Sequence, residues 1–170
     1  MAYRDPLTGL PNYRCMQVHL KKVLQEADRK DHVAALMMVD LDNFKALNDS
    51  IGHPRADEVL REVGERLSQA TGSNDLPIRM HGDEFVVVRR RMTRFGRLIF
   101  LAKRIETALS NSFKVDGKSV GVGCSIGIAL YPIHAESKQA LVQCADDALY
   151  KAKRPANDQA WRLYRPESNS

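Results

Sequence analysis

The chain has 170 residues, of which 44% are hydrophobic and 28% charged, an ordinary balance for a globular protein with one core. Its formal charge of +5 favours anionic ligands without choosing between a nucleotide and a nucleic acid. Because no apolar stretch approaches the roughly 18 residues that span a bilayer, and the three cysteines are too scattered for a disulfide framework or a zinc site, we expect a soluble, cytoplasmic domain without membrane contact.

The chain begins with a predicted turn, a helix and a strand. Residues 5–12 contain two prolines, a glycine and a candidate helix cap, which predicts a compact turn. Apolar residues then recur at helical spacing from about residue 12 to 29. Residues 33–41 form a continuous apolar run that ends in carboxylates, a pattern typical of a central strand buried on both faces.

Two helical segments follow this strand. A short helical turn is expected over residues 43–49, and residues 52–54 interrupt it with a glycine and a proline. An apolar stripe over residues 56–67 predicts a second long helix that ends near 71–74.

A tight turn between two predicted strands carries adjacent carboxylates. Residues 78–80 and 85–90 are the strands, and Gly82 precedes Asp83 and Glu84 at the tip of the turn. A Gly-Asp pair is common in turns for backbone reasons alone. The turn by itself therefore leaves a structural role and a chemical role open.

The last third of the chain alternates helices and strands. Residues 95–109 and 141–152 have helical periodicity, residues 115–118 predict a turn between two strands, and 160–164 predict a short final strand. The strand-rich stretch 119–131 contains three glycines where a neighbouring element could approach closely, namely Gly121, Gly123 and Gly127. Strands and helices alternate without repeats, which indicates an α and β domain around one sheet.

A second acidic stretch strengthens the chemical interpretation of the turn. Asp40 follows the apolar run 33–39, and two strands of one sheet could bring Asp40 close to Glu84. Mg²⁺ takes oxygen ligands and needs only one or two carboxylates when phosphates supply the rest. From the residues alone, a magnesium site and two unrelated solvated strand ends are equally open.

Six separate motifs occur along the chain. They are DPLTGLPN at 5–12, VDLDNFKALND at 39–49, IGHPRADEVL at 51–60, RMHGDEF at 79–85, SIGIALYP at 125–132 and ADDALYKAK at 145–153. Together and in this order they resemble the GGDEF domains, the diguanylate cyclase family. Several ordered matches are far more specific than any one of them.

The resemblance implies a specific architecture. It is an α+β fold with a central, largely antiparallel five-stranded sheet flanked by helices and a βαββαβ core, like the palm of nucleotidyl cyclases and polymerases. We further expect one domain over residues 1–165 and a polar tail over 166–170, cut from a longer multidomain regulatory protein. Its covalent neighbours would be sensory domains and possibly an EAL phosphodiesterase.

The family condenses two GTP molecules into cyclic di-GMP in a homodimer, which needs bound metal, cations on the phosphates and a base for the hydroxyl. By resemblance, Asp40, the backbone carbonyl of Leu41 and Glu84 would hold Mg²⁺ (or Mn²⁺). Asp83 would accept the proton, with electrostatic support of the metal as the alternative role. Lys45 would stabilise charge on the phosphates, and a solvated surface lysine is its alternative.

Other positions match nucleotide-binding residues of the family. Asn48 and Asp57 match the pair that recognises guanine, since an amide and a carboxylate can pair with its acceptor and donor groups. The remaining candidates for substrate binding are His53, His81, Gly82 and Lys153. A lysine in the last turn of a helix is also expected simply from the helix dipole.

The sequence departs from the family pattern in several places. His81 replaces the first glycine of the signature; a strained backbone there would cost on the order of 1 kcal/mol and lower the rate, whereas an outward imidazole would change little. Asn157 replaces a phosphate-binding arginine, and Ala56 replaces a glycine without expected harm. Residues 72–75 lack the arginine of the family's inhibitory Arg-x-x-Asp motif, so we expect product inhibition through this site to be missing.

Three functions are compatible with these patterns. The first is an active diguanylate cyclase, and the second is a catalytically impaired GTP-binding module that regulates an attached domain. The third is an RNA-binding domain, because βαββαβ order and positive charge also describe that class. RNA-recognition domains stack bases on strand aromatics, and only 6% of this chain is aromatic, without a strand cluster. Specific nucleic-acid binding is therefore not expected.

Overall fold

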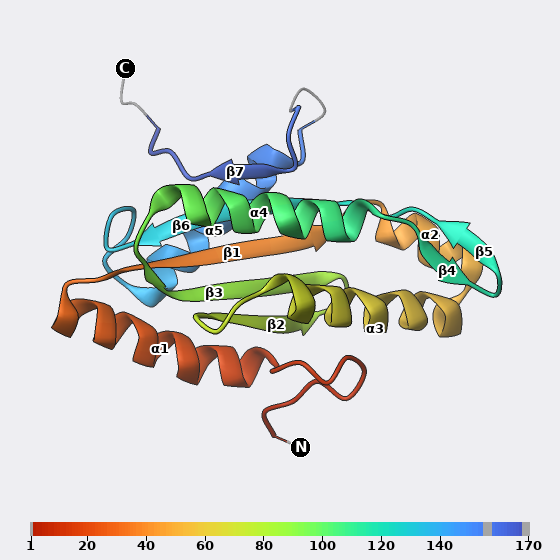
Figure 1. Ribbon diagram of the computed structural model, residues 1–170, viewed down its shortest axis with the longest axis horizontal. Helices are drawn as coiled ribbons and strands as arrows, with labels where there is room; N and C mark the ends of the chain where they lie inside the picture. Colours follow the sequence, from red (N-terminus) through yellow and green to blue (C-terminus); the bar gives the residue numbers. More distant parts are fainter. Residues whose placement is uncertain (1, 155–157, 168–170) are drawn as a thin grey trace.

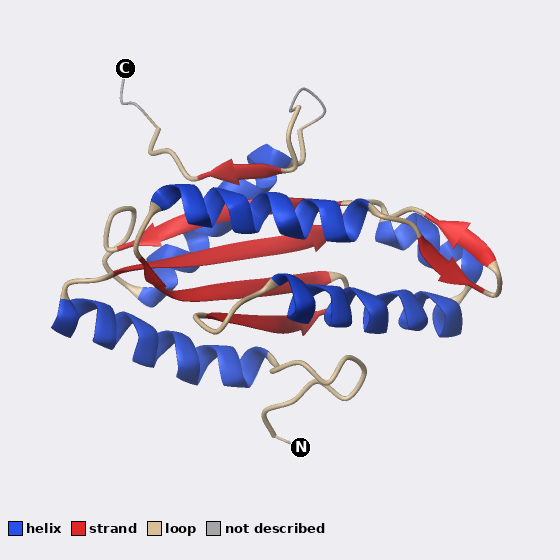
Figure 2. Ribbon diagram, viewed as in Figure 1, coloured by secondary structure: helices blue, strands red, loops and turns tan. Residues whose placement is uncertain are grey.

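The computed structural model of the chain describes residues 2–154 and 158–167. Its centre is a five-stranded sheet with the order β2-β3-β1-β6-β7, antiparallel except for the parallel pair β6 and β7 (Figures 1 and 2). The strands are β1 (Val33–Leu41), β2 (Asp75–His81), β3 (Glu84–Met92), β6 (Cys124–Tyr131) and β7 (Trp161–Leu163). The expected largely antiparallel five-stranded sheet is confirmed.

Helices cover both faces of this sheet (Figure 2). They are α1 (Tyr13–Lys30), α2 (Phe44–Ile51), α3 (His53–Ala70), α4 (Phe95–Ser110) and α5 (Lys138–Ala152). Helices α1 and α5 pack on one face, and α3 and α4 pack on the other. A separate hairpin, β4 (Phe113–Val115) and β5 (Lys118–Val120), surrounds the turn that the sequence predicted.

Strand β1 lies in the middle of the sheet and contributes to two cores. Leu36 and Met38 face α1 and α5, whereas Met37 and Val39 face α3 and α4. Both sets are buried because a strand's side chains alternate between faces and both faces are covered. This explains why the run is apolar without alternation, and why the acidic residues that end it mark the rim of the sheet.

The expected helix starts and stops have local causes. The side chain of Asn12 caps α1 by accepting a hydrogen bond from the Cys15 N–H, and Ser137 caps α5 through the Ala140 N–H. Helices α2 and α3 are separated by Gly52 alone, whose φ of +84° favours glycine. The corner between these two helices is therefore fixed by one residue.

Two expectations about the strands need correction. Glu84 is not at the turn tip: it is the first residue of β3, so the turn between the strands consists of Gly82 and Asp83. A Cβ added at Gly121 would meet no atom within 4 Å, whereas one at Gly127 would lie 2.2 Å from the backbone oxygen of Ala145 in α5. Close approach of a neighbouring backbone thus occurs at Gly127 and not at Gly121. No helix in the described ranges is long and apolar enough to cross a bilayer.

Candidate functional site

Three strand ends meet where β1 finishes. The register pairs Asp40 with Glu84 of β3 on one side and with Ser125 of β6 on the other. Directly opposed residues of antiparallel strands project to the same face, with Cβ atoms about 4.5–5.5 Å apart. The two carboxylates that the sequence predicted to converge therefore lie side by side.

The turn between β2 and β3 is attached to the same strand end. Gly82 has a φ of +55°, a conformation that L side chains rarely adopt. The next residue, Asp83, accepts a backbone hydrogen bond from the Leu41 N–H at 3.2 Å. This bond holds the backbone of Asp83 beside the last residue of β1.

Asp40 has the chemistry of a cation ligand. Its side chain is buried, and its Oδ2 accepts from the Lys153 ammonium. Its Oδ1 is buried and has no hydrogen-bond partner among the described residues. A buried carboxylate oxygen without a partner is costly, so the arrangement fits a ligand that supplies positive charge.

A divalent metal is the group that these residues fit. The described part of the chain holds no cluster of three or more His, Cys, Asp or Glu side chains with metal-binding geometry. A metal bound at Asp40 and Glu84 would thus take two carboxylate ligands, and its remaining coordination positions would be filled by a backbone carbonyl and by oxygens of a bound ligand. Mg²⁺ bound together with a phosphorylated ligand has this pattern of coordination.

Burial, and after it the neighbouring carboxylates, raises the pKa of two acids at the site. Burial raises the pKa of Asp83, and the charge of Asp40 raises it further. Burial also raises the pKa of Glu84, His81 opposes this rise, and the charges of Asp40 and Asp83 add to it. A bound cation would relieve this repulsion.

Lys153 brings positive charge to the same place. It caps the C-terminal end of α5 and forms an ion pair with Asp40. Partial burial disfavours the charged ammonium, but the hydrogen bond from Lys153 to Asp40 and the charges of Asp40 and Asp83 outweigh it and raise the pKa of Lys153. Lys153 is therefore charged beside the carboxylates, as a phosphate-binding lysine requires.

The guanine-recognition candidates lie on α2 and α3, which meet at Gly52. Asn48 is half-buried on α2, and its Oδ1 is buried without a hydrogen-bond partner in the described ranges. Asp57 is half-buried on the first turns of α3, and His53 is exposed at its first residue. The unpartnered amide oxygen of Asn48 is available to a donor on a ligand.

Lys45 is exposed in the first turn of α2. It makes no hydrogen bond or ion pair with any described residue. Lys45 thus follows the end of β1 by four residues but makes no hydrogen bond or ion pair with Asp40 or Glu84.

His81 ends β2, and of the two alternatives left open for it the structure shows the outward imidazole without a left-handed backbone. Its φ is not in the left-handed region, where Gly82 lies instead. The imidazole is 76% exposed and its Nε2 is 3.3 Å from Glu84 Oε2. The side chain therefore points into solvent and still contacts a candidate metal ligand. Asn157, the other departure from the family pattern, lies outside the described residues.

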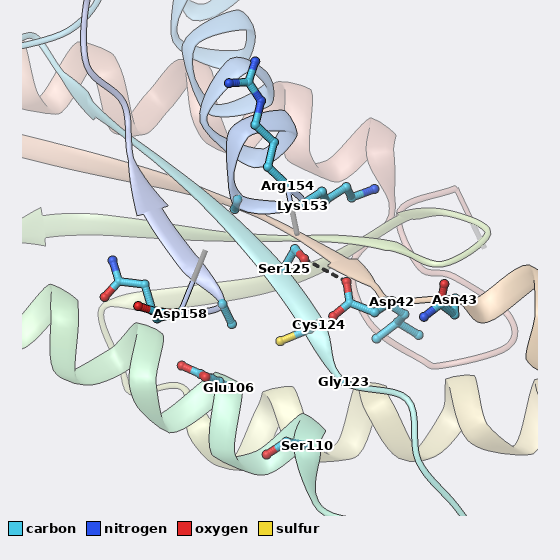
Figure 3. A pocket seen from close by; sticks show the side chains of 14 residues that line it. Asp42, Asn43, Glu106, Ser110, Gly123, Cys124, Ser125, Lys153, Arg154 and Asp158 are labelled. Carbon is cyan, nitrogen blue, oxygen red and sulfur yellow. Dashed lines mark hydrogen bonds between the residues drawn. The ribbon is translucent and has the colours of Figure 1, made fainter. Parts of the chain in front are cut away.

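A cavity of about 670 Å³ opens at this end of the sheet (Figure 3). Lys153 and Arg154 reach it from the α5 side, and Glu106 and Ser110 line it from α4. Asp42 lies on its wall and accepts a hydrogen bond from Ser125 Oγ at 2.8 Å. The other lining residues are Leu41, Asn43, Gly123, Cys124, Ala152, Asp158, Gln159 and Ala160. Of the candidate site residues, only Leu41 and Lys153 line this cavity; Asp40 and Glu84 do not. Its walls carry both acidic and basic side chains.

Sequence reasoning missed Asp146 on α5. Burial raises the pKa of Asp146, the charge of Asp147 raises it as well, and Lys153 lowers it. Asp146 also acts electrostatically on Glu84. The sequence did carry a signal for Asp146: it lies seven residues before Lys153, and residues two helical turns apart lie on the same face of a helix.

Comparisons with known proteins agree on one family. The profile described as "Diguanylate cyclase, GGDEF domain" matches residues 2–159. The diguanylate cyclase TpbB of Pseudomonas aeruginosa is 35% identical over 156 residues, which cover 91% of this chain and 36% of that protein. The cyclic di-GMP phosphodiesterase PdeR of Escherichia coli is 34% identical over 169 residues, or 99% of this chain and 25% of that protein. The chain thus spans about a third or less of these curated relatives.

Solved structures show the same fold. The GGDEF domain of TpbB from P. aeruginosa superposes with a TM-score of 0.90 at 34% identity, covering 95% of this chain and 94% of that one. The GGDEF domain of DgcB from Caulobacter crescentus, solved in complex with c-di-GMP, has a TM-score of 0.84 at 25% identity and covers 96% and 95% of the two chains.

Proposed function

Because this chain belongs to the family of GGDEF domains, the diguanylate cyclases, we propose that it binds GTP with Mg²⁺ or Mn²⁺ and condenses two GTP into cyclic di-GMP. One domain holds one GTP, so the reaction joins two domains in a homodimer with their sites facing each other. The observation that carries the proposal is the opposition of Asp40 and Glu84, with an unpartnered buried oxygen on Asp40.

Each residue has a distinct role in this proposal. Asp40, Glu84 and the Leu41 carbonyl would hold the metal, which when bound supplies positive charge for the phosphates. Asp83 accepts the proton of the attacking 3′-hydroxyl. The raised pKa of Asp83 supports this role, because a base works best when its pKa moves toward the working pH. Lys153 binds phosphate oxygens as a point charge.

Guanine recognition and further phosphate binding are assigned to α2, α3 and the turn. Asn48 and Asp57 pair with the guanine edge, and the unpartnered oxygen of Asn48 supports this assignment. The other substrate contacts in the proposal are His53, His81, Gly82 and Lys45. Lys45 is free to turn toward a phosphate because it has no partner in the described chain.

The decisive experiment incubates the domain with GTP and Mg²⁺ and separates the nucleotides by chromatography. Cyclic di-GMP from the parent but not from Asp83→Asn supports the cyclase. Asp75→Asn is a suitable control, because Asp75 lies at the other end of the β2–β3 hairpin and is paired with Arg89. Turnover that persists in Asp83→Asn would remove the proposed base.

A second function is favoured by one observation. His81 occupies a signature glycine position and contacts Glu84, so the domain could bind GTP without condensing it and regulate an attached domain such as an EAL phosphodiesterase. A relative named as a phosphodiesterase matches along 99% of this chain. Saturable binding of a non-hydrolysable GTP analogue, together with absence of product at high enzyme concentration, would select this function over the cyclase.

The proposal also places the domain in a larger protein. Residues 1–165 form the catalytic unit in this view, with 166–170 as a polar tail, and sensory or EAL domains attached in a cytoplasmic signalling protein. Matches to relatives several times longer than the chain support this placement.

A further inference from the structure

One arginine connects the N-terminal turn to the turn of the β2–β3 hairpin. Arg79, on β2, donates from Nη1 to both carboxylate oxygens of Asp5, each at 3.1 Å. The same guanidinium donates from Nε and Nη2 to the Gly82 carbonyl oxygen at 3.3 and 3.0 Å. Its planar fork thus binds two groups that are far apart in sequence.

Asp5 is itself held rigidly. Its Oδ2 also accepts from the N–H and the hydroxyl of Thr8, both at 2.8 Å. Its own N–H donates to the Leu10 carbonyl at 2.7 Å, and the Arg79 N–H donates to the Pro11 carbonyl at 3.0 Å. Burial opposes ionisation of Asp5, but bonds from Thr8 and Arg79 outweigh it and lower the pKa of Asp5. Asp5 is therefore a fixed, ionised anchor.

The bonds from Arg79 to the Gly82 carbonyl help to fix the backbone of Asp83. The Gly82 carbonyl belongs to the peptide bond that leads into Asp83, and Arg79 holds it. The Asp83 carbonyl, on the other side of the residue, accepts from the Leu41 N–H. Both peptide groups that flank Asp83 are therefore held, and the free motion left to its carboxylate is rotation of the side chain.

We propose that Arg79 is a positioning residue for Asp83, with Asp5 as its anchor, so that the N-terminal turn takes part in placing the proton acceptor. This inference rests on the proposed function for its kinetic consequence but not for its structural one. Displacement of a catalytic group by about 1 Å costs up to about a hundredfold in rate, and the Gly82–Asp83 turn has no bulky side chain of its own to resist it.

The chain supplies a matched control for the loss of a buried ion pair. Arg89 donates to Asp75 from Nε at 2.7 Å and from Nη2 at 3.0 Å. This pair also belongs to the β2–β3 hairpin, and its arginine is about as buried as Arg79, with the two arginine side chains 16% and 13% exposed. Its aspartate is the more buried of the two, 0% exposed against 15% for Asp5. It lies at the end of the hairpin remote from Gly82 and Asp83. Arg89→Lys therefore loses a similar fork without touching the turn.

The experiment compares Arg79→Lys, Asp5→Asn and Arg89→Lys in the whole chain. The first readout is the amide chemical shift of Asp83, and the hydrogen-exchange rate of the Leu41 amide, in the nucleotide-free domain. We expect both Arg79→Lys and Asp5→Asn to shift the Asp83 amide and to speed exchange at Leu41 about tenfold or more over Arg89→Lys. Comparable melting temperatures for Arg79→Lys and Arg89→Lys would show that overall stability is not the cause.

The second readout is the kinetics of cyclic di-GMP formation. Arg79→Lys should lower kcat about tenfold while KM for GTP changes less than about threefold, because positioning acts on the transition state. Arg89→Lys should leave kcat within about twofold. Equal losses of kcat in both variants, or an unmoved Asp83 amide in Arg79→Lys, would overturn the inference. If the parent forms no product, the proposed function fails and the amide readouts alone decide this one.

Discussion

Helix α5 carries Lys153 to the site, and Gly127 of β6 determines how closely that helix packs. A Cβ at residue 127 would lie 2.2 Å from the Ala145 oxygen, 2.3 Å from the Leu149 nitrogen and 2.7 Å from the Leu149 Cα. All three are backbone atoms, which no change of rotamer can move. Gly127→Ala must therefore shift α5 away from the sheet by about 1 Å or more, since nonbonded contacts lie near 3.5–4.0 Å.

The expected cost is at the upper end for overpacked cores, about 3 kcal/mol in the free energy of unfolding. For a chain of this size, that corresponds to a fall of about 6–12 °C in melting temperature. Because Lys153 ends the displaced helix, its ion pair with Asp40 should weaken as well. Denaturant unfolding and calorimetry, both without nucleotide, measure the effect.

Gly96→Ala is the matched control for this substitution. Gly96 lies exposed near the start of α4, and a Cβ there meets nothing within 4 Å. Alanine is the better helix former, so the control should gain up to about 0.5–1 kcal/mol. A cost below about 1 kcal/mol for Gly127→Ala would mean that α5 does not pack on β6 this closely.

Three further predictions concern single side chains. The pKa of Asp83 is raised on folding, so between its ordinary and raised values the folded state binds more protons than the unfolded state, and this group lowers stability as pH rises through that window. Calorimetry should therefore show Asp83→Asn melting about 2 °C higher than the parent at pH 7 and no higher at pH 3. An equal gain at both pH values would contradict the electrostatic cause. Burial raises the pKa of the Cys124 thiol to about 12, so little of the reactive thiolate forms at pH 8. Mass spectrometry after treatment with a thiol reagent at pH 8 should therefore find the half-buried Cys15 labelled and Cys124 unlabelled until the chain unfolds. Removing the imidazole near Glu84 in His81→Gly should lower the Mg²⁺ concentration for half-maximal GTP binding by about twofold, and a rise in a magnesium titration would count against competition by His81.

The site was predictable from the sequence as a set of residues but not as a geometry. The apolar run into Asp40 and the Gly82–Asp83 turn identified two acidic strand ends. Whether they meet depends on strand order and register, and a shift of one residue would have sent the Asp40 side chain to the opposite face. The structure's register brings Asp40 opposite Glu84.

Conformation at the signature histidine was likewise undecided by sequence. A glycine position suggested positive φ, but the strand continues through His81 and the left-handed residue is Gly82. Of the two alternatives left open at residue 81, backbone strain is therefore absent and the imidazole points outward. The imidazole also contacts Glu84, which no local pattern indicated. Side-chain contacts across a turn depend on its exact start, which propensities do not fix.

The sequence by itself determined the periodicities, the breaks and the ordered motifs, because these depend on neighbours along the chain. Periodicity was enough to predict a central strand over 33–41 buried on both faces, and the family resemblance added a sheet flanked by helices. Only the tertiary structure decided which distant groups touch: Asp5 with Arg79, and Lys153 with Asp40. Such contacts are set by packing of whole elements, where the approach of α5 at Gly127 matters as much as the charged residues themselves.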